Sequence, residues 1–216
     1  MPGRPRAKPA ARRARSEEER QAKLQAILDA ALDVFAEKGF ADTRLEDVAA
    51  RAGVAKGTIY LYVQSKESLF EALVRSGIAA PIEAAAERIL ALDASAETML
   101  RMLFGWMRQE VLGTRRKEIA RLVIAEAGRF PEIAALYHRE VVGRGLRLLR
   151  KVAARAVARG EFKSDELVRF PQLAIAPGLV AILWANLFER FEPLDAEAML
   201  KAHLTLLMRA LKDEAP

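Results

Sequence analysis

Apolar residues recur at helical spacing along most of the chain. The first two stripes of this kind are formed by Leu24, Ile27, Leu28, Ala31, Val34 and Phe35, and then by Leu45, Val48, Ala49 and Ala52. Residues at positions i, i+3, i+4 and i+7 lie on one face of an α-helix, so each stripe predicts an amphipathic helix. Similar stripes continue from residue 65 to the C-terminus, and runs of β-branched or aromatic residues are scarce. The pattern therefore predicts an all-α fold of about nine helices.

A helix-turn-helix is predicted between Thr43 and Tyr62. Thr43 precedes the second stripe, where its hydroxyl is expected to accept a hydrogen bond from a free backbone N–H. Gly53 is expected to end this helix, because glycine adopts a left-handed conformation at little cost. A second short helix follows over residues 55–62, with Ile59 facing back toward the first. Two short helices joined by a turn that holds a glycine form this motif.

The second helix carries groups that suit a phosphate backbone. They are Lys56, Gly57, Thr58, Tyr60 and Tyr62, which combine a cation and three hydroxyls with a glycine that permits close approach. Ser65 is expected to cap the next helix, and Lys66 falls in its first turn, where free N–H groups favour an anion. The alternative is a helical hairpin with ordinary exposed polar side chains. This alternative does not explain why helix caps, a turn glycine and cations all occur at the spacing that a helix-turn-helix requires.

These residues carry a family resemblance. The matching positions are Thr43, Val48, Ala49, the run 52–60, Tyr62, Ser65, Lys66, Glu67 and Leu69. Over about Arg20 to Val74 the sequence resembles the tetracycline-repressor (TetR) family of bacterial transcription regulators. Val63 departs from the family pattern, which usually has a phenylalanine at this position.

The resemblance implies a homodimer that binds double-stranded DNA at a palindromic operator, with residues 55–62 of each subunit in the major groove. Base contacts are expected from Arg44, Lys56 and Leu61. Phosphate contacts are expected from Thr43, Thr58, Tyr60, Tyr62 and Lys66, and Ala55 and Gly57 complete the face that approaches DNA.

Charge is distributed unevenly along the chain. The net charge is +6, and residues 1–15 hold six basic residues and no acidic one, whereas residues 16–74 hold seven basic and eleven acidic residues. We interpret residues 1–15 as a disordered basic arm that contacts DNA, with a solvated tail of no function as the alternative. Ser16 is expected to cap a long first helix. The expected domains are this arm, a three-helix DNA-binding head over residues 16–64, and a helical ligand-binding and dimerisation domain over residues 65–216.

Residues 170–188 contain no charged side chain. A membrane span of that length is possible in principle, but two prolines, Gln172, Gly178 and Asn186 interrupt the segment. A buried helix that pairs with the last helix (about residues 195–211) in a four-helix dimer interface explains the segment better. The residues expected at this interface are Leu179, Leu183, Leu187, Leu200, Leu204 and Leu207.

The middle of the chain supplies bulky apolar residues for a possible cavity. The expected ligand-binding residues are Met102, Leu103, Trp106, Met107, Phe130, Tyr137 and Val141. Methionine repacks easily around varied ligands, and pockets between helices often hold small molecules. Ordinary core packing is the alternative. If a pocket exists, its ligand should be apolar or amphipathic.

No residue pattern supports catalysis. The chain has no cysteine, its histidines His138 and His203 are far apart in sequence, and no phosphate-binding glycine loop or nucleophile elbow is present. We therefore expect neither an enzyme nor a bound metal or cofactor. The N-terminal segment lacks the apolar stretch of a secretory signal, which is typical of a cytoplasmic protein.

The sequence thus favours a ligand-responsive transcriptional repressor. A small molecule entering the helical body would move the helix that begins at residue 65 and release DNA, provided that it binds the two states differently. A transcriptional activator or a ligand-independent repressor is one alternative. A small-molecule-binding helical protein with a vestigial DNA-binding head is another.

Overall fold

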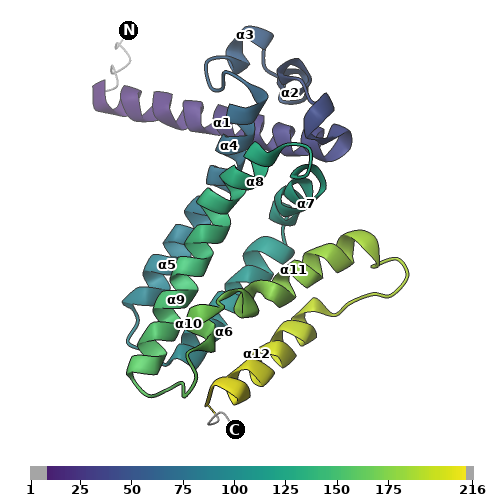
Figure 1. Ribbon diagram of the computed structural model, residues 1–216. Coiled ribbons are helices and arrows are strands. Elements are labelled where there is room, and N and C mark those ends of the chain that lie inside the picture. The colour runs from purple at the N-terminus through teal and green to yellow at the C-terminus, as the bar shows by residue number, and fades with distance from the viewer. Residues whose placement is uncertain (1–8, 213–216) are drawn as a thin grey trace. The chain divides into compact units, whose positions relative to one another are not determined.

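The computed structural model describes residues 9–212, and all regular structure in that range is helical (Figure 1). The all-α prediction is therefore confirmed. The described residues form ten continuous helices, and three of these contain a π-helical segment. The chain divides into two compact units, residues 1–73 and 74–216, which we call the head and the body.

The head is built around three phenylalanines. Its helices are α1 (Pro9–Asp42), α2 (Leu45–Arg51), α3 (Lys56–Ile59) and α4 (Lys66–Val74). Phe35 stacks on Phe40 with ring centroids 5.7 Å apart, and Phe70 meets each of them edge-on at 5.8 Å. Because α4 contributes Phe70 to this core, the head ends after Leu73 rather than after residue 64.

Two glycines set the path of the chain through the head. Gly39 has φ 74° and breaks α1 near its end, so that Phe40 folds back onto Phe35. Gly53 has φ 67° and follows α2, where the Val54 N–H donates to the Ala49 carbonyl at 3.0 Å. Both positions need the left-handed backbone that glycine adopts readily, as expected for Gly53.

Three expectations about the head need correction. The helix α1 begins at Pro9, so residues 9–15 of the expected arm are helical and Ser16 is not a cap, while residues 1–8 lie outside the described range. Alanine and arginine favour helix, and proline is tolerated in a first turn. Thr43 does not cap α2 either, because its hydroxyl donates to the Gly39 carbonyl at 2.7 Å and Arg44 is the N-cap.

The third correction concerns α3, which covers Lys56–Ile59 instead of residues 55–62. After this single turn the N–H groups of Tyr62 and Val63 both donate to the Ile59 carbonyl at 3.0 Å. Glycine, threonine, isoleucine and tyrosine are weak helix formers, so the segment continues as turns.

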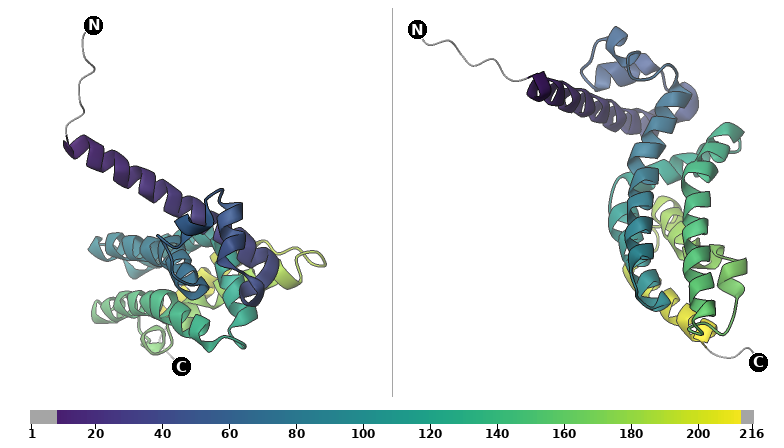
Figure 2. Two further views of the ribbon diagram at one scale, coloured as in Figure 1. Left: turned by 90° about the horizontal axis from the view of Figure 1, so that it is seen from above. Right: turned by 90° about the vertical axis from the view of Figure 1, so that its left-hand side faces the viewer.

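The body contains the remaining helices. They are η1 (Arg75–Ala79), α5 (Ala80–Ala91), α6 (Ala96–Trp106), η2 (Met107–Leu112), α7 (Arg116–Glu126), α8 (Pro131–Tyr137), η3 (His138–Val142), α9 (Gly143–Ala158), α10 (Glu166–Arg169), α11 (Gln172–Leu187) and α12 (Ala196–Lys212). The helices α5 and α9 run alongside each other, and α6 packs against both (Figure 2). Leu149 of α9 and Leu100 of α6 are fully buried in the core that results, to which α12 adds Leu204 and Met208.

The helix α11 continues through Pro177. Proline has no N–H, so the carbonyl one turn earlier, that of Leu173, receives no bond from within the helix. The ring Nε2 of His203 on α12 lies 2.9 Å from this carbonyl oxygen and satisfies it as a donor. None of the helices between residues 9 and 212 combines the length and the apolarity that a bilayer span requires.

Candidate DNA-binding face and ligand cavity

The turn from α2 into α3 presents the exposed face of the head. Leu61, directly after α3, is 78% exposed, although isolated leucines usually lie inside. Arg44, at the start of α2, is also exposed, as are Ala55 and Gly57 at the start of α3. A side-chain carbon built on Gly57 would meet nothing within 4 Å, so the backbone there is open to close approach.

Glu46 on α2 holds two side chains of this face. Its carboxylate lies 2.9 Å from Lys56 Nζ and accepts a hydrogen bond from the Tyr60 hydroxyl at 3.3 Å. The hydrogen bond from Lys56 holds the pKa of Glu46 below its usual value, and the same bond raises the pKa of Lys56. The contacts with Glu46 therefore hold both side chains in place on the exposed face.

Two residues expected to bind phosphate have structural roles instead. Thr43 is 3% exposed, and its hydroxyl is bonded to Gly39. Lys66 donates to the carbonyls of Phe40 at 3.1 Å and Ala41 at 2.7 Å, and its ammonium group lies 4.8 Å from the Phe40 ring centroid. Cations suit the carbonyl end of a helix, so Lys66 stabilises the end of α1. Thr58 and Tyr62, by contrast, remain partly exposed.

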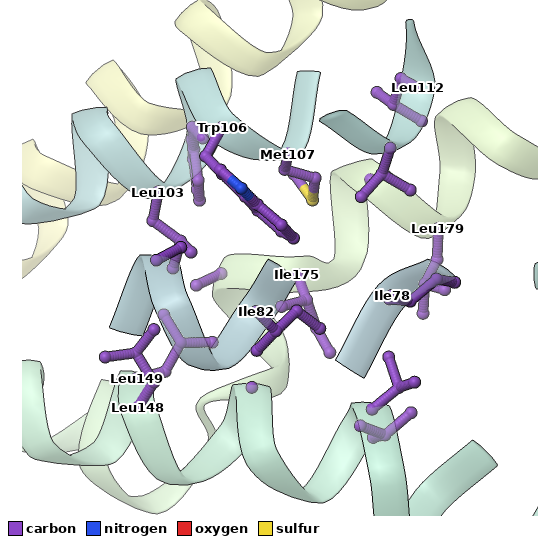
Figure 3. Close-up of a pocket in the computed structure, with 18 of the residues that line it drawn as sticks. Ile78, Ile82, Leu103, Trp106, Met107, Leu112, Leu148, Leu149, Ile175 and Leu179 are labelled. Atoms are coloured by element: carbon purple, nitrogen blue, oxygen red, sulfur yellow. The ribbon is translucent and has the colours of Figure 1, made fainter. Parts of the chain in front are cut away.

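The body contains an apolar cavity of about 140 Å³ that is partly open to solvent (Figure 3). Helices α5, α6, α9 and α11 all contribute to its wall. The lining residues are Ile78, Ile82, Ala85, Leu103, Phe104, Trp106, Met107, Val111, Leu112, Tyr137, Val141, Val142, Gly145, Leu148, Leu149, Ala174, Ile175, Gly178, Leu179 and Ile182. A concave apolar site with few polar groups is typical of small-molecule binding.

All three π-helical segments contribute to this wall. Ile78 comes from η1, Val111 from η2 and Val141 from η3. A π-helical turn contains an extra residue and often occurs at functional sites. The spacing of apolar residues in the sequence did not reveal these π-helical turns.

Five of the expected ligand-binding residues line the cavity and two do not. Those in the wall are Leu103, Trp106, Met107, Tyr137 and Val141. Met102 is 43% exposed, because it lies outside the face of α6 on which Met99 and the other buried residues of this helix point into the core. Phe130 is the N-cap residue of α8 and lies beside the Arg129 guanidinium group.

Two glycines in the wall differ in the room around them. A side-chain carbon on Gly178 of α11 would lie 2.6 Å from Met107 Sδ, so a larger residue there would displace the flexible end of the Met107 side chain. A side-chain carbon on Gly145 of α9 would meet nothing within 4 Å. Gly145 thus borders the open space of the cavity, whereas the space beside Gly178 is occupied by the Met107 side chain.

A buried carboxylate ties together the helices next to the cavity. The side chain of Glu140 is only 4% exposed and accepts hydrogen bonds from Arg75 at 3.2 Å, Arg139 at 2.9 Å and Arg144 at 2.7 Å. Arg144 also pairs with Glu83 on α5. The hydrogen bond from Arg139, together with those from the other arginines, holds the pKa of Glu140 below its usual value despite burial.

The leucines expected at a dimer interface fall into two groups. Those on α11 are exposed, at 48% for Leu179, 37% for Leu183 and 56% for Leu187. Those on α12 face inward, because Leu200 and Leu204 are buried and Leu207 packs against the core of the body. The leucine that α12 exposes is Leu206, at 65%.

Two family models match the chain. The model of the bacterial regulatory proteins of the tetR family matches residues 27–73, and the model of the tetracyclin repressor-like C-terminal domain matches residues 95–203. The chain belongs to the TetR family. The resemblance inferred from residues 20–74 is thus confirmed, and it extends to the body, where the sequence motif was absent.

Curated relatives of this TetR-family regulator match about a quarter to a third of the chain. The HTH-type transcriptional regulator RutR of Escherichia coli is 52% identical over 54 residues, which are 25% of this chain and 26% of RutR. The fatty acid metabolism regulator protein of Bacillus subtilis is 38% identical over 71 residues, 33% of this chain and 37% of that protein. The chain therefore matches only a quarter to a third or so of the length of these relatives.

Solved structures match over most of the fold. FadR from Bacillus halodurans superposes with a TM-score of 0.72 at 22% identity, covering 89% of this chain and 97% of that chain. FadR from Bacillus subtilis in complex with stearoyl-CoA superposes with a TM-score of 0.64 at 23% identity, covering 87% and 98%. At such identities the likeness establishes the TetR fold.

Proposed function

We propose that this TetR-family protein is a homodimeric repressor that leaves its operator when a small apolar molecule occupies the cavity of the body. The observation that carries the proposal is the presence, in one chain, of an exposed helix-turn-helix face and an apolar cavity walled by π-helical turns. The stearoyl-CoA bound to the B. subtilis FadR structure supports ligand control of this kind of fold.

The DNA-binding role rests on the α2–α3 face. Arg44, Lys56 and Leu61 are exposed there and are proposed to read base edges. Tyr60, Thr58 and Tyr62, with the backbone at residues 55–57, are proposed to contact phosphates. Binding would exchange the contacts of Lys56 and Tyr60 with Glu46 for contacts with DNA.

The coupling is proposed to run along the chain from the cavity to the head. Ile78 lines the cavity and belongs to η1, which follows α4 without a break. A ligand that packs against Ile78 differently in two states of η1 would shift α4, which carries Phe70 of the head core. A bulged turn is a suitable element for such a shift because its extra residue can be accommodated in more than one place.

The dimer is proposed to form through the exposed side of α11 together with the Leu206 side of α12. Apolar side chains exposed in a row on one helix indicate a partner surface. Two such helices from each subunit can form a four-helix interface.

The function is tested by a mobility shift of the full chain on the DNA upstream of its own gene. Leu61→Ala should lower affinity for the preferred site by about tenfold or more and weaken its preference over scrambled DNA. Leu92→Ala, which alters an exposed leucine of the body, is the matched control and should leave binding unchanged. Absence of sequence-specific binding by the unaltered protein would reject the proposal in favour of a vestigial head.

A reporter gene behind the bound site separates repressor from activator. Deletion of the gene for this protein should raise expression of the reporter if the protein is a repressor and lower it if the protein is an activator. Expression that does not respond to any cavity ligand, while DNA binding persists, would identify a ligand-independent repressor.

A further inference from the structure

The wall of the cavity is free of charge. Every one of its lining residues is apolar apart from Tyr137 and Trp106, whose hydroxyl and indole N–H are its polar side-chain groups. Burial of an unpaired ionised group in such surroundings is strongly unfavourable. A ligand that carries a charge into this cavity would therefore need a cation or an anion from outside the wall.

The nearest arginines do not supply such a cation. Arg75, Arg139 and Arg144 all bond to the buried carboxylate of Glu140, which precedes the wall residue Val141. Arg144 is shared with Glu83 as well. Recruiting one of these arginines to a ligand carboxylate would remove one of the three hydrogen-bonded partners of the buried Glu140, which is unfavourable.

Two hydrogen-bond donors of the wall lack a protein partner. Within the described part of the chain neither the Tyr137 hydroxyl nor the Trp106 indole N–H is hydrogen-bonded to another residue. Figure 3 shows the Trp106 indole projecting toward Ile175 between Leu103 and Met107. Burial raises the pKa of Tyr137 to about 12, so its hydroxyl stays protonated and remains a donor at physiological pH. No fully buried polar side-chain atom in the described residues lacks a hydrogen-bond partner, so both donors are accessible and can donate to water or to an acceptor on a ligand.

The volume limits the size of the ligand. The cavity of about 140 Å³ is close to the roughly 150 Å³ of an engineered apolar cavity in another protein that accommodates benzene. One ring with a short substituent fits such a space. The uncharged wall offers no partner for the phosphates of a coenzyme such as that in the stearoyl-CoA complex of B. subtilis FadR.

We propose that the cavity binds a compact, uncharged aromatic or alicyclic molecule whose carbonyl oxygen accepts a hydrogen bond from Tyr137, with the Trp106 N–H as a second donor. The inference rests on the proposed ligand control, and it specifies the class of effector. Apolar contacts with the wall supply most of the affinity, and the donors select for the acceptor oxygen. The uncharged wall disfavours a carboxylate or a coenzyme phosphate inside the cavity.

Calorimetry on the full chain without DNA tests this inference. The probes are acetophenone, ethylbenzene and benzoate, which share an aromatic ring. Acetophenone carries an uncharged acceptor oxygen, ethylbenzene carries no acceptor, and benzoate carries a negative charge. Acetophenone should bind at least a hundredfold more tightly than benzoate at neutral pH. Tyr137→Phe should weaken acetophenone about fivefold to tenfold and leave ethylbenzene unchanged or slightly stronger, because only the ketone loses a hydrogen bond.

A pair of glycine variants locates the binding site. Gly145→Val projects into the cavity and should abolish binding of both uncharged probes. Gly105→Val on α6 makes the same change in a helix, also with open space around the new carbon, but outside the cavity wall, and should leave binding intact. Thermal unfolding of both variants confirms that they are folded.

Three results would overturn the inference. They are benzoate binding as tightly as acetophenone, an equal effect of Tyr137→Phe on the ketone and the hydrocarbon, and no binding of either uncharged probe at 1 mM, roughly the weakest affinity of interest. These measurements do not involve DNA. If acetophenone binds as described but does not release the protein from the operator, the proposed function fails and the inferred ligand class stands. If the protein binds the operator but binds neither uncharged probe, the inferred ligand class fails and the proposed DNA-binding role stands.

Discussion

The head and the body pack their interiors in different ways. In the head, Phe35, Phe40 and Phe70 lie in mutual ring contact, at 5.7 and 5.8 Å between centroids. In the body, twenty residues surround a cavity of about 140 Å³, and three helices in its wall contain π-helical turns. Empty space in an interior forfeits contacts and lowers stability, so it persists where function requires it. The head therefore has a closely packed core, whereas the body retains an apolar cavity.

The largest effect is expected when two leucines of the body, one buried and one exposed, are replaced by glutamate. Leu204→Glu places a carboxylate among buried core residues and should cost at least about 4 kcal/mol of unfolding free energy. Leu183→Glu places it on the exposed side of α11 and should leave the subunit folded but monomeric. Circular dichroism during urea unfolding measures the first effect, and sedimentation measures the second.

The two substitutions distinguish a leucine in the core of the body from a leucine on its exposed surface. An unaltered protein that is monomeric at micromolar concentration would end the dimer proposal. A dimer that survives Leu183→Glu would move the interface away from α11.

The second effect compares large-to-small changes in the two interiors. Phe35→Ala removes a fully buried ring from the head and should cost about 3–5 kcal/mol. Leu103→Ala removes a half-buried side chain that already borders open space and should cost about 2 kcal/mol or less. Equal costs, measured by urea unfolding of both variants, would mean that the cavity is not the looser region.

The head could be predicted from sequence because its determinants are local. The left-handed Gly53, the inward Leu45–Ala49 face and the exposed Leu61 all follow from spacing within a few residues. The body depends on contacts between distant segments. Spacing alone identified an apolar face on α12, yet that face packs inside the subunit, and only the structure shows Leu206 on the other side.

The misassigned site residues have the same explanation. Met102 was included for its chemistry, although the buried residues Ala96, Met99, Leu100 and Phe104 set the inward face of α6 and leave residue 102 outside it. Lys66 was included because cations at helix starts bind anions, yet the end of α1, twenty-five residues earlier in sequence, occupies it. Neither partner could be identified from local spacing. The π-helical turns carry no known short pattern, and they too became visible only in three dimensions.

The third prediction contrasts two lysines of the head. Lys66→Met removes charge-assisted bonds to the Phe40 and Ala41 carbonyls and should cost about 1.5–3 kcal/mol of stability. Lys56→Met removes only a contact with the exposed Glu46, so it should leave stability nearly unchanged while altering DNA sequence preference. Urea unfolding and a mobility shift on cognate and scrambled DNA distinguish the two. A stable Lys66→Met protein that loses affinity for all DNA alike would restore a phosphate-binding role to Lys66.

The smallest effect concerns how the body satisfies the carbonyl of Leu173. The helix α11 supplies no donor for it because Pro177 lacks an N–H, and His203 of α12 donates instead across 2.9 Å. His203→Ala should therefore cost about 1–2 kcal/mol, including the loss of its contact with the Phe104 ring. In a Pro177→Ala background the new N–H can bond to Leu173 within the helix. The cost of His203→Ala should then fall by about 1 kcal/mol, which a double-mutant cycle in urea measures as coupling between the two positions. Zero coupling would show that the histidine stabilises α12 by packing alone. A positive result would mean that a hydrogen bond between helices α11 and α12 contributes to the stability of the body.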